Sequence, residues 1–269
     1  MNNLLKRTVS GALFVLLLTG CIYGHPVAFL ILFCGIGVLG LAEFSRMASH
    51  LNASVCKGWF LPAGGLLVAA GFADAYRHNN AGYLLFGGVL LAACLSELFR
   101  KKGNAFQNTA FSCFGVVYTC LPFCLLSYLP FLVSGTWEPG IVYFPFVLVW
   151  ANDTFAYLIG SRFGKHKLFP RISPHKSWEG AIGGTVCSIA AAFFLGPWLA
   201  GLSWVHSIAA GALVSLFGIF GDLTESMFKR SIEIKDSGTL MPGHGGVLDR
   251  FDAALFAIPA LFLYLKFVF

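Results

Sequence analysis

The chain has 269 residues, of which 57% are hydrophobic, 16% are aromatic and only 11% are charged. Soluble domains carry about 25% charged residues, so this composition excludes an ordinary soluble protein. The mean hydropathy of +0.77 favours an all-α polytopic membrane protein, because each span needs about 20 predominantly apolar residues. The apolar runs are continuous rather than alternating, which excludes an outer-membrane barrel.

Apolar runs along the chain predict about nine transmembrane helices. Two short runs flank Pro122, and we treat them as one kinked or re-entrant element over residues 106–134. We expect residues 1–135 to form scaffold helices and residues 136–269 to carry the functional site, within one integral membrane unit. The other eight predicted spans are 8–24, 26–47, 58–75, 81–98, 139–162, 179–200, 204–229 and 251–268.

The basic residues predict the orientation of these spans. With a cytoplasmic N-terminus, 16 of the 18 Lys and Arg residues fall in cytoplasmic segments, and only Arg77 and Lys266 fall outside. Nine spans then place the C-terminus outside. We therefore expect a multi-pass protein of the inner cell membrane whose active site faces the cytoplasm. The net charge of +6 is explained by these flanks and does not indicate a nucleic-acid partner.

Eight cysteines lie in or beside the apolar runs, and no two of them form a CxxC pair. This spacing favours small buried hydrophobic residues over disulfides or metal ligands. Candidate metal ligands are therefore sought among the carboxylates.

One strongly charged stretch, residues 221–252, reads GDLTESMFKRSIEIKDSGTLMPGHGGVLDRFD and holds ten charged side chains and one histidine. Its acidic groups suit a divalent cation and its basic groups suit phosphate. Gly243, Gly245 and Gly246 flank His244 in a turn whose backbone N–H groups can form an anion-binding nest. We expect His244, Gly245 and Gly246 to contact phosphate.

Acidic residues occur in the helix before this turn and in the helix after it. Asp222, Ser226 and Lys229 are four and seven residues apart, so they share one helix face. Asp249 opens the following helix. Magnesium commonly binds one or two carboxylates plus substrate phosphates, so we predict Asp222 and Asp249 as ligands of Mg²⁺, and a second cation is compatible with the sequence. The other charged residues expected at the site are Arg230, Lys235, Asp236, Arg250 and Asp252.

Residues from an earlier part of the chain are expected to form the opposite wall. Asp153 lies nine residues before Arg162, roughly 13 Å below the basic rim at 1.5 Å per residue, and Asp222 reaches a similar depth. Charged residues in spans normally face a cavity or a partner, so Asp153 is weighed equally between a site residue and a structural ion pair. The substrate-binding residues predicted on this wall are Asn152, Asp153, Ser173 and Lys176.

The loop over residues 160–180 contains a false phosphate-loop signal and a helix cap. Its glycines enclose three residues instead of four, and His166 stands where Ser or Thr should bind magnesium, so a Walker site is rejected. Ser177, followed closely by Glu179 and Gly180, is predicted to cap the next helix, whose N-terminal amides attract anions.

These motifs resemble a known family. Ser226-Met-Phe-Lys-Arg, then Lys235-Asp236, then the run from His244 to Asp252, resembles the signature of bacterial phosphatidate cytidylyltransferases (CDP-diacylglycerol synthases). Asn152-Asp153 and the 173–180 loop resemble a second shared region of that family. The chain departs from the family pattern at four positions, which are His175, Ser177, Glu233 (where Gly is frequent) and Ala253.

The resemblance implies transfer of CMP from CTP to phosphatidic acid, giving CDP-diacylglycerol and pyrophosphate for phospholipid biosynthesis. By analogy with phosphomonoesters, the lipid phosphate has a second pKa of about 6. It is therefore already ionised at neutral pH, and no Ser-His-Asp triad is needed to activate it. Catalysis would rest on positioning and charge neutralisation. The implied partners are CTP, phosphatidic acid and the lipid bilayer, and a homodimer is compatible with the sequence. The residues implied to neutralise phosphate are Lys176, Lys229, Arg230 and Lys235.

Two other functions stay open from the sequence. A CTP-dependent lipid or polyprenol kinase would use similar groups but release a nucleoside diphosphate instead of pyrophosphate. An ion-coupled membrane transporter would also place carboxylates within spans. Against the transporter, the charges gather on one side, and the outer loops offer no matching site.

Overall fold

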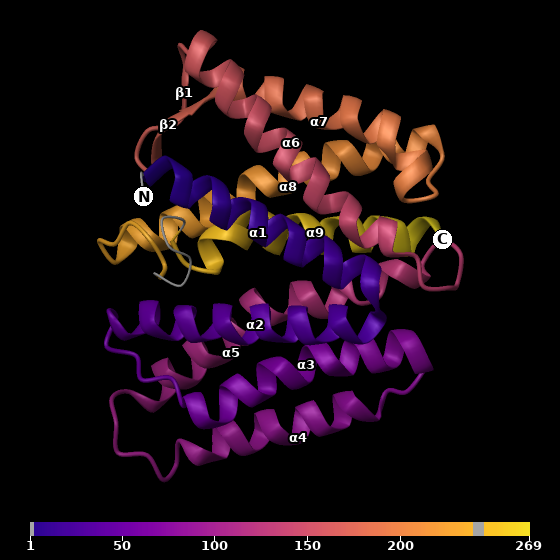
Figure 1. Cartoon of the computed structure of the whole chain (residues 1–269). Helices are drawn as coiled ribbons and strands as arrows, with labels where there is room; N and C mark the ends of the chain where they lie inside the picture. The colour runs from indigo at the N-terminus through magenta and orange to yellow at the C-terminus, as the bar shows by residue number, and fades with distance from the viewer. Residues whose placement is uncertain (1–2, 239–244) are drawn as a thin grey trace. The chain divides into compact units, whose positions relative to one another are not determined.

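The computed structural model describes residues 3–238 and 245–269, and within them it contains nine α-helices, a 3-10 turn and one small sheet (Figure 1). Every predicted span coincides with one helix, with ends that agree to within a few residues except at the first and fifth. Pro122 lies inside α5, which is continuous, so the merged element around it is confirmed as one helix. The helices are α1 (Asn3–Gly24), α2 (Pro26–Ser49), α3 (Lys57–Arg77), α4 (Ala81–Ser96), α5 (Ala105–Leu126), α6 (Pro139–Phe163), α7 (Trp178–Leu199), α8 (Trp204–Ser231) and α9 (Leu248–Val268).

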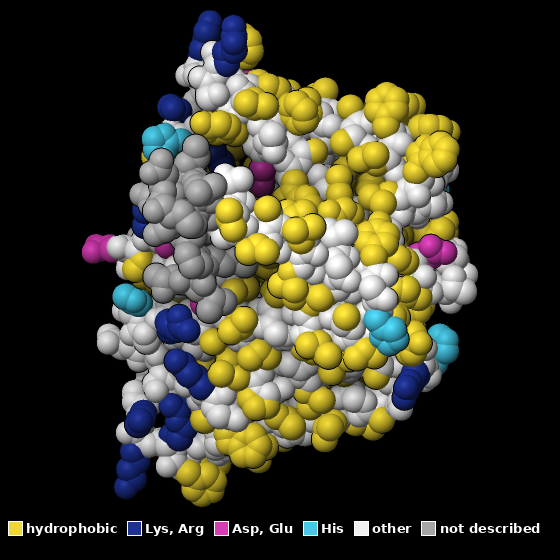
Figure 2. Space-filling view, in the orientation of Figure 1, with side chains coloured by type: hydrophobic (Ala, Val, Ile, Leu, Met, Phe, Trp, Pro, Cys, Tyr) yellow, Lys and Arg dark blue, Asp and Glu magenta, His cyan; other side chains and the backbone are white. Residues whose placement is uncertain are grey.

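Among the described residues, seven helices are long and apolar enough to cross a membrane. They are α2, α3, α5 with the following turn, α6, α7, α8 and α9, whereas α4 and the searched part of α1 are apolar but shorter. On the face shown in Figure 2, hydrophobic side chains cover the helix flanks, and Lys and Arg gather near helix ends. Such flanks suit a lipid environment, so the class of a multi-pass α-helical membrane protein is confirmed.

The chain forms two compact units. The first comprises Met1–Tyr128 and Ser231–Phe251, and the second comprises Leu129–Arg230 and Asp252–Phe269. The charged stretch is therefore divided: its helical beginning belongs to the second unit, whereas the loop after α8 and the first residues of α9 belong to the first. The predicted assignment of scaffold and site to residues 1–135 and 136–269 stays a prediction.

In the first unit, α2, α3 and α5 pack through small residues and aromatic rings. A Cβ atom at Gly64 would lie 2.7 Å from Cys120 Sγ, so α3 and α5 approach closely only because Gly64 lacks a side chain. Phe33 and Phe123 lie nearby with ring centroids 5.5 Å apart. All eight cysteines are free; Cys120 and Cys124 are buried, as predicted, whereas the other six are only half-buried.

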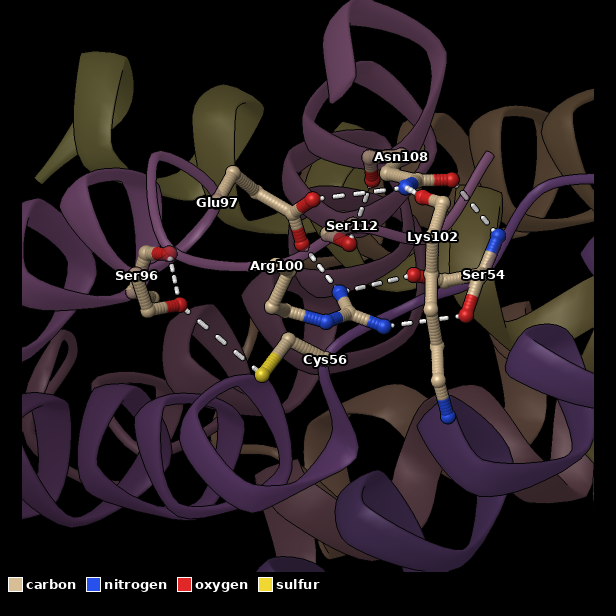
Figure 3. Close-up of polar contacts among 9 residues, drawn as sticks. Ser54, Cys56, Ser96, Glu97, Arg100, Lys102, Asn108 and Ser112 are labelled. Atoms are coloured by element: carbon tan, nitrogen blue, oxygen red, sulfur yellow. Dashed lines mark hydrogen bonds and ion pairs between the residues drawn. The ribbon is translucent and has the colours of Figure 1, made fainter. Parts of the chain in front are cut away.

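A polar network joins the loop before α3 to the loop before α5 in the same unit (Figure 3). Arg100 forms an ion pair with Glu97 and donates to the Ser54 carbonyl at 2.9 Å. Asn108, which is fully buried, donates to the Lys102 carbonyl at 2.7 Å and to Glu97 Oε2 at 3.3 Å. Because a buried carboxylate without partners is costly, these contacts allow Glu97 to be only 6% exposed.

In the second unit, α6 and α7 pack along a line of small residues. A Cβ atom at Gly184 would lie 2.7 Å from the Asn152 carbonyl oxygen, so the two backbones are nearly in contact there. Spacing of four residues keeps the small residues on one face, as in closely packed membrane helices. The buried small residues of α7 are Gly180, Gly184, Ser188, Ala192 and Gly196.

The loop between α6 and α7 contains a hairpin that the sequence did not predict. Strands β1 (Lys167–Phe169) and β2 (Ser173–Ser177) pair antiparallel, with Lys167 opposite Ser177. Ser177 ends β2, and its Oγ accepts from the backbone N–H of Gly180 at 3.2 Å. The predicted N-terminal cap of α7 is therefore confirmed.

Candidate active site

Helices α6, α7 and α8 and the hairpin line a cavity of about 440 Å³ within the second unit. This volume lies in the range of about 300–1,000 Å³ that is usual for small-molecule pockets. Asp153 and Asp222 come from different helices and line the same cavity, as their similar predicted depth implied. The lining residues are Asn152, Asp153, Ala156, Tyr157, Gly160, Ser161, Leu168, His175, Lys176, Ser177, Gly180, Ala181, Gly218, Ile219 and Asp222.

Asp222 is held by two partners at the cavity wall. Lys176 Nζ donates to Asp222 Oδ2 at 2.5 Å, and Ser226 Oγ donates to Asp222 Oδ1 at 3.2 Å. The second contact confirms that Asp222 and Ser226 share one helix face. Lys176 reaches Asp222 from β2, so the hairpin brings this cation across to α8. The side chains of Lys176 and Asp222 are 29% and 30% exposed, so water and solutes still reach the pair.

Asp222 belongs to a group of acidic side chains on α6, α8 and α9. The Asp252 carboxyl interacts electrostatically with Asp222, Glu225 and Asp153. Glu225 is fully buried and pairs with Lys229 at 3.3 Å. Like charges at short range disfavour one another's ionised forms.

Sequence reasoning missed Glu225. Its position three residues after Asp222 and four before Lys229 was the available signal, because side chains at these spacings are neighbours on a helix. Lys229 had been predicted to neutralise phosphate, and in this structure it pairs with Glu225.

Asn152 is fixed by a buried polar chain that runs across three helices. Its side chain is 3% exposed, and its Oδ1 accepts from Ser215 Oγ of α8 at 2.6 Å. Ser215 Oγ also lies 2.8 Å from Thr185 Oγ1 of α7, and Thr185 donates to the Ala181 carbonyl at 2.9 Å. Asn152 also lines the cavity, and its amide carries an Nδ2 donor group besides the Oδ1 atom that Ser215 contacts.

Asp249, the second predicted metal ligand, lies in the first unit and organises the start of α9. Its Oδ2 accepts from the backbone N–H groups of Ser237 at 2.9 Å and Gly246 at 2.7 Å. Gly246 was predicted to bind phosphate, and here its N–H is directed to Asp249. Gly245 has a φ of +80°, and a Cβ there would lie 2.6 Å from Asp249 Oδ2, so glycine suits this position. His244 lies outside the described residues.

The other predicted residues lie away from the cavity lining. Ser173 is half-buried and faces Phe169 across the hairpin. Glu233, where the resembling family frequently has Gly, has a φ of +58°, which is the left-handed region that favours glycine. His175 was noted from the sequence only as a position that departs from the family pattern, and it was not predicted as a site residue. In the structure it does line the cavity, beside Lys176. The exposed predicted residues are Arg230, Lys235, Asp236 and Arg250.

Comparison with known proteins places these motifs in a family. The sequence profile described as the cytidylyltransferase family matches residues 5–268. A phosphatidate cytidylyltransferase of Staphylococcus saprophyticus is 39% identical over 239 residues, which cover 82% of this chain and 85% of that protein. Proteins of the same name from Staphylococcus haemolyticus and Staphylococcus aureus strain COL are 41% and 39% identical over 174 residues. Those two matches cover 61% of this chain and 62% of each relative. A profile matched from residue 5 to residue 268 shows that the chain belongs to the cytidylyltransferase family.

Proposed function

We propose that this protein transfers CMP from CTP to phosphatidic acid, producing CDP-diacylglycerol and pyrophosphate at the membrane. The observation that carries the proposal is the cavity of the second unit, where Lys176 and Asp222 meet beside a group of carboxylates. An anion-binding cation and an acidic group in one cavity suit a nucleoside triphosphate. The family and the names of the relatives support the same activity.

The proposed reaction needs little acid–base chemistry from the protein. A phosphate oxygen of the lipid attacks the α-phosphorus of CTP, the new P–O bond forms, and the bond to the bridging oxygen of pyrophosphate breaks. The lipid phosphate is ionised at neutral pH, so no side chain has to remove a proton from it. Lys176 would offset negative charge on a phosphoryl group, and Asn152 would donate from Nδ2 to orient a substrate.

Magnesium fits the residues at this site. Within residues 3–238 and 245–269, no three His, Cys, Asp or Glu side chains form a ready metal site. Magnesium usually takes only one or two carboxylates together with substrate phosphates and water, so Asp222 in the cavity is a suitable ligand. We keep Asp222 and Asp249 as its proposed ligands, the latter on sequence grounds, and a second cation stays compatible. A bound Mg²⁺ would supply charge stabilisation to the transferring phosphate.

The proposed topology has nine crossings, a cytoplasmic N-terminus and a C-terminus outside. It requires α1 and α4 to cross as well, although α4 has only 16 residues and a length of about 24 Å. Local thinning of the bilayer or flanking basic residues can accommodate a short helix, and Arg100, Lys101 and Lys102 follow α4 after three intervening residues. The positive-inside distribution supports a cytoplasmic active site in the inner membrane, and a homodimer stays a proposal.

The test is a transfer assay on the purified full-length protein in detergent with labelled CTP, phosphatidic acid and Mg²⁺. We expect labelled CDP-diacylglycerol and pyrophosphate. Release of a nucleoside diphosphate would favour the kinase instead. Absence of lipid-linked CMP, under conditions in which a related enzyme is active, would overturn the proposal. The alternative function of an ion-coupled transporter would then have to be tested.

The Asp222→Asn variant tests the cavity itself. It removes the negative charge of a proposed Mg²⁺ ligand, and an interaction with a charged group contributes about 1.5–3 kcal/mol, so we expect a loss in kcat/KM of about tenfold to 150-fold. Glu138→Gln makes the same chemical change at an exposed residue before α6 and should keep the wild-type rate. A near wild-type rate for Asp222→Asn would show that the catalytic cavity has been assigned wrongly.

A further inference from the structure

A buried carboxylate of α2 contacts the segment that carries Asp249, and the proposed reaction assigns it no role. Glu43 is 2% exposed. Its Oε2 accepts from the backbone N–H of Leu248 at 2.9 Å and from Ser237 Oγ at 3.2 Å. All four residues belong to the first compact unit. Glu43 thus connects an early membrane helix to a loop and a helix start about 200 positions later in the sequence.

The contact with Leu248 occurs where α9 begins. The first N–H groups of a helix have no partner within the helix, and an anion near them is favoured by the helix dipole. Glu43 therefore fixes the first turn of α9 from a neighbouring helix. Gly238 and Gly246 allow the loop to close on the carboxylate, because a Cβ at either position would collide with Glu43.

Ser237 joins Glu43 to Asp249. Its Oγ lies 2.9 Å from Asp249 Oδ2 and 3.2 Å from Glu43 Oε2, and its backbone N–H donates to the same Asp249 oxygen at 2.9 Å. Movement of Glu43 would therefore remove one acceptor from Ser237 Oγ and one from the Leu248 N–H in the first turn of α9. Both contacts bear on the Asp249 carboxylate, because Ser237 donates to it and Asp249 itself lies in the first turn of α9.

The chemical type of Glu43 indicates a role beyond packing. An ionisable residue within a strongly apolar helix is expensive, and an apolar side chain of similar size would fill the same space without that cost. We propose that Glu43 is a positioning residue, which holds Ser237 and the start of α9 so that Asp249 is presented in one orientation. The link to catalysis rests on the proposed function and on Asp249 as a metal ligand, whereas the anchoring of α9 does not.

The first unit offers a matched control in Glu97. This second glutamate is also buried, at 6% exposure, but its partners are Arg100 and Asn108 in the network around the loop before α5 (Figure 3). Glu97→Gln makes the same chemical change at similar burial in the same unit. It should loosen its own network and leave the start of α9 unaffected.

The first measurement is amide hydrogen exchange in the purified, substrate-free protein, followed in peptides that cover residues 245–252. Glu43→Gln keeps one oxygen that can accept from Leu248 but loses the charge, so we expect exchange of this segment to rise about tenfold. Glu43→Ala removes the acceptor, so exchange should rise further. Glu97→Gln should leave these peptides at the wild-type rate.

The second measurement is the dependence of the initial transfer rate on Mg²⁺ concentration. Glu43→Gln should lower kcat and raise the Mg²⁺ concentration for half-maximal rate, with a smaller change in the KM for CTP. Glu97→Gln should change neither value.

The two measurements can fail independently, so failure of the anchoring role of Glu43 can be told apart from failure of the proposed enzymatic activity. Unchanged exchange over residues 245–252 in Glu43→Gln, or an equal rise in Glu97→Gln, would overturn the anchoring role. Faster exchange with an unaltered Mg²⁺ dependence would overturn the link to Asp249. A wild-type protein that makes no CDP-diacylglycerol, but whose Glu43→Gln variant shows the expected exchange, would refute the proposed function and support the anchoring of α9.

Discussion

Replacing Ser215 with Ala tests whether the buried polar chain holds Asn152 for a ligand. The change removes the 2.6 Å hydrogen bond to Asn152 Oδ1 and leaves the fold of α8 otherwise intact. Asn152 then loses the described side-chain hydrogen bond to α8, so its amide, which lines the cavity, can rotate. We therefore expect weaker substrate binding together with lower stability.

The magnitude follows from the environment of the bond. Ser215 is fully buried between apolar helices, and hydrogen bonds between membrane helices contribute about 0.6 kcal/mol on average and up to about 1.7 kcal/mol. That range corresponds to a fall in kcat/KM of about threefold to about 20-fold, expressed mainly as a higher KM. The corresponding decrease in Tm is about 1–6 °C for a chain of this size.

The control is Ser188→Ala, because Ser188 is equally buried and donates across the α6–α7 interface to the Leu148 carbonyl at 3.2 Å without lining the cavity. Thermal unfolding in detergent and steady-state transfer kinetics are measured for both variants. Both should lower Tm, and only Ser215→Ala should raise KM. Equal KM values in the two variants would refute the idea that Ser215 positions Asn152.

Two further predictions concern the packing that supports the cavity. Ser177→Ala removes the cap of α7 and should cost about 1 kcal/mol, which thermal unfolding would show as a Tm lower by about 2–4 °C. Gly184→Ala places a Cβ 2.7 Å from the Asn152 carbonyl oxygen and should destabilise by about 1–3 kcal/mol, whereas Gly88→Ala in α4, which has open space around it, should not lower Tm. Equal Tm values for the two glycine variants would contradict the close packing of α6 on α7.

The helices could be predicted because their signal is local. Long apolar runs, bounded by Pro, Gly and charged residues, give nearly the same bounds in the sequence and in the structure for all helices except α1 and α5. The hairpin between α6 and α7 escaped prediction because β1 has only three residues and the strands carry no clear alternation of apolar and polar side chains. The cap at Ser177 was predictable because its signal lies within four residues.

The site residues also differ in whether a local sequence signal could predict their contacts. The Asp222–Ser226 contact and the shared cavity of Asp153 and Asp222 follow from helical spacing and depth. Glu43 could not be connected to Asp249 from the sequence, because a single chain gives no signal for a contact between residues about 200 positions apart. Lys176 was expected at the site for its charge, but its pairing with Asp222 depends on the hairpin.

The charge balance of the cavity bears directly on how anionic substrates can bind there. Four carboxylates, on Asp153, Asp222, Glu225 and Asp252, interact in the second unit, and Lys176 and Lys229 are both paired with members of this group. Carboxyl groups outnumber these lysines, and negative charge on them opposes the binding of anionic substrates such as CTP and phosphatidic acid. A divalent cation would offset negative charge on this group and would let Lys176 exchange Asp222 for a phosphate oxygen, since both acceptors carry negative charge. We therefore propose that the acidic group and Lys176 of the hairpin act together as a cation-dependent phosphate site, and the Mg²⁺ dependence of the transfer rate would test this.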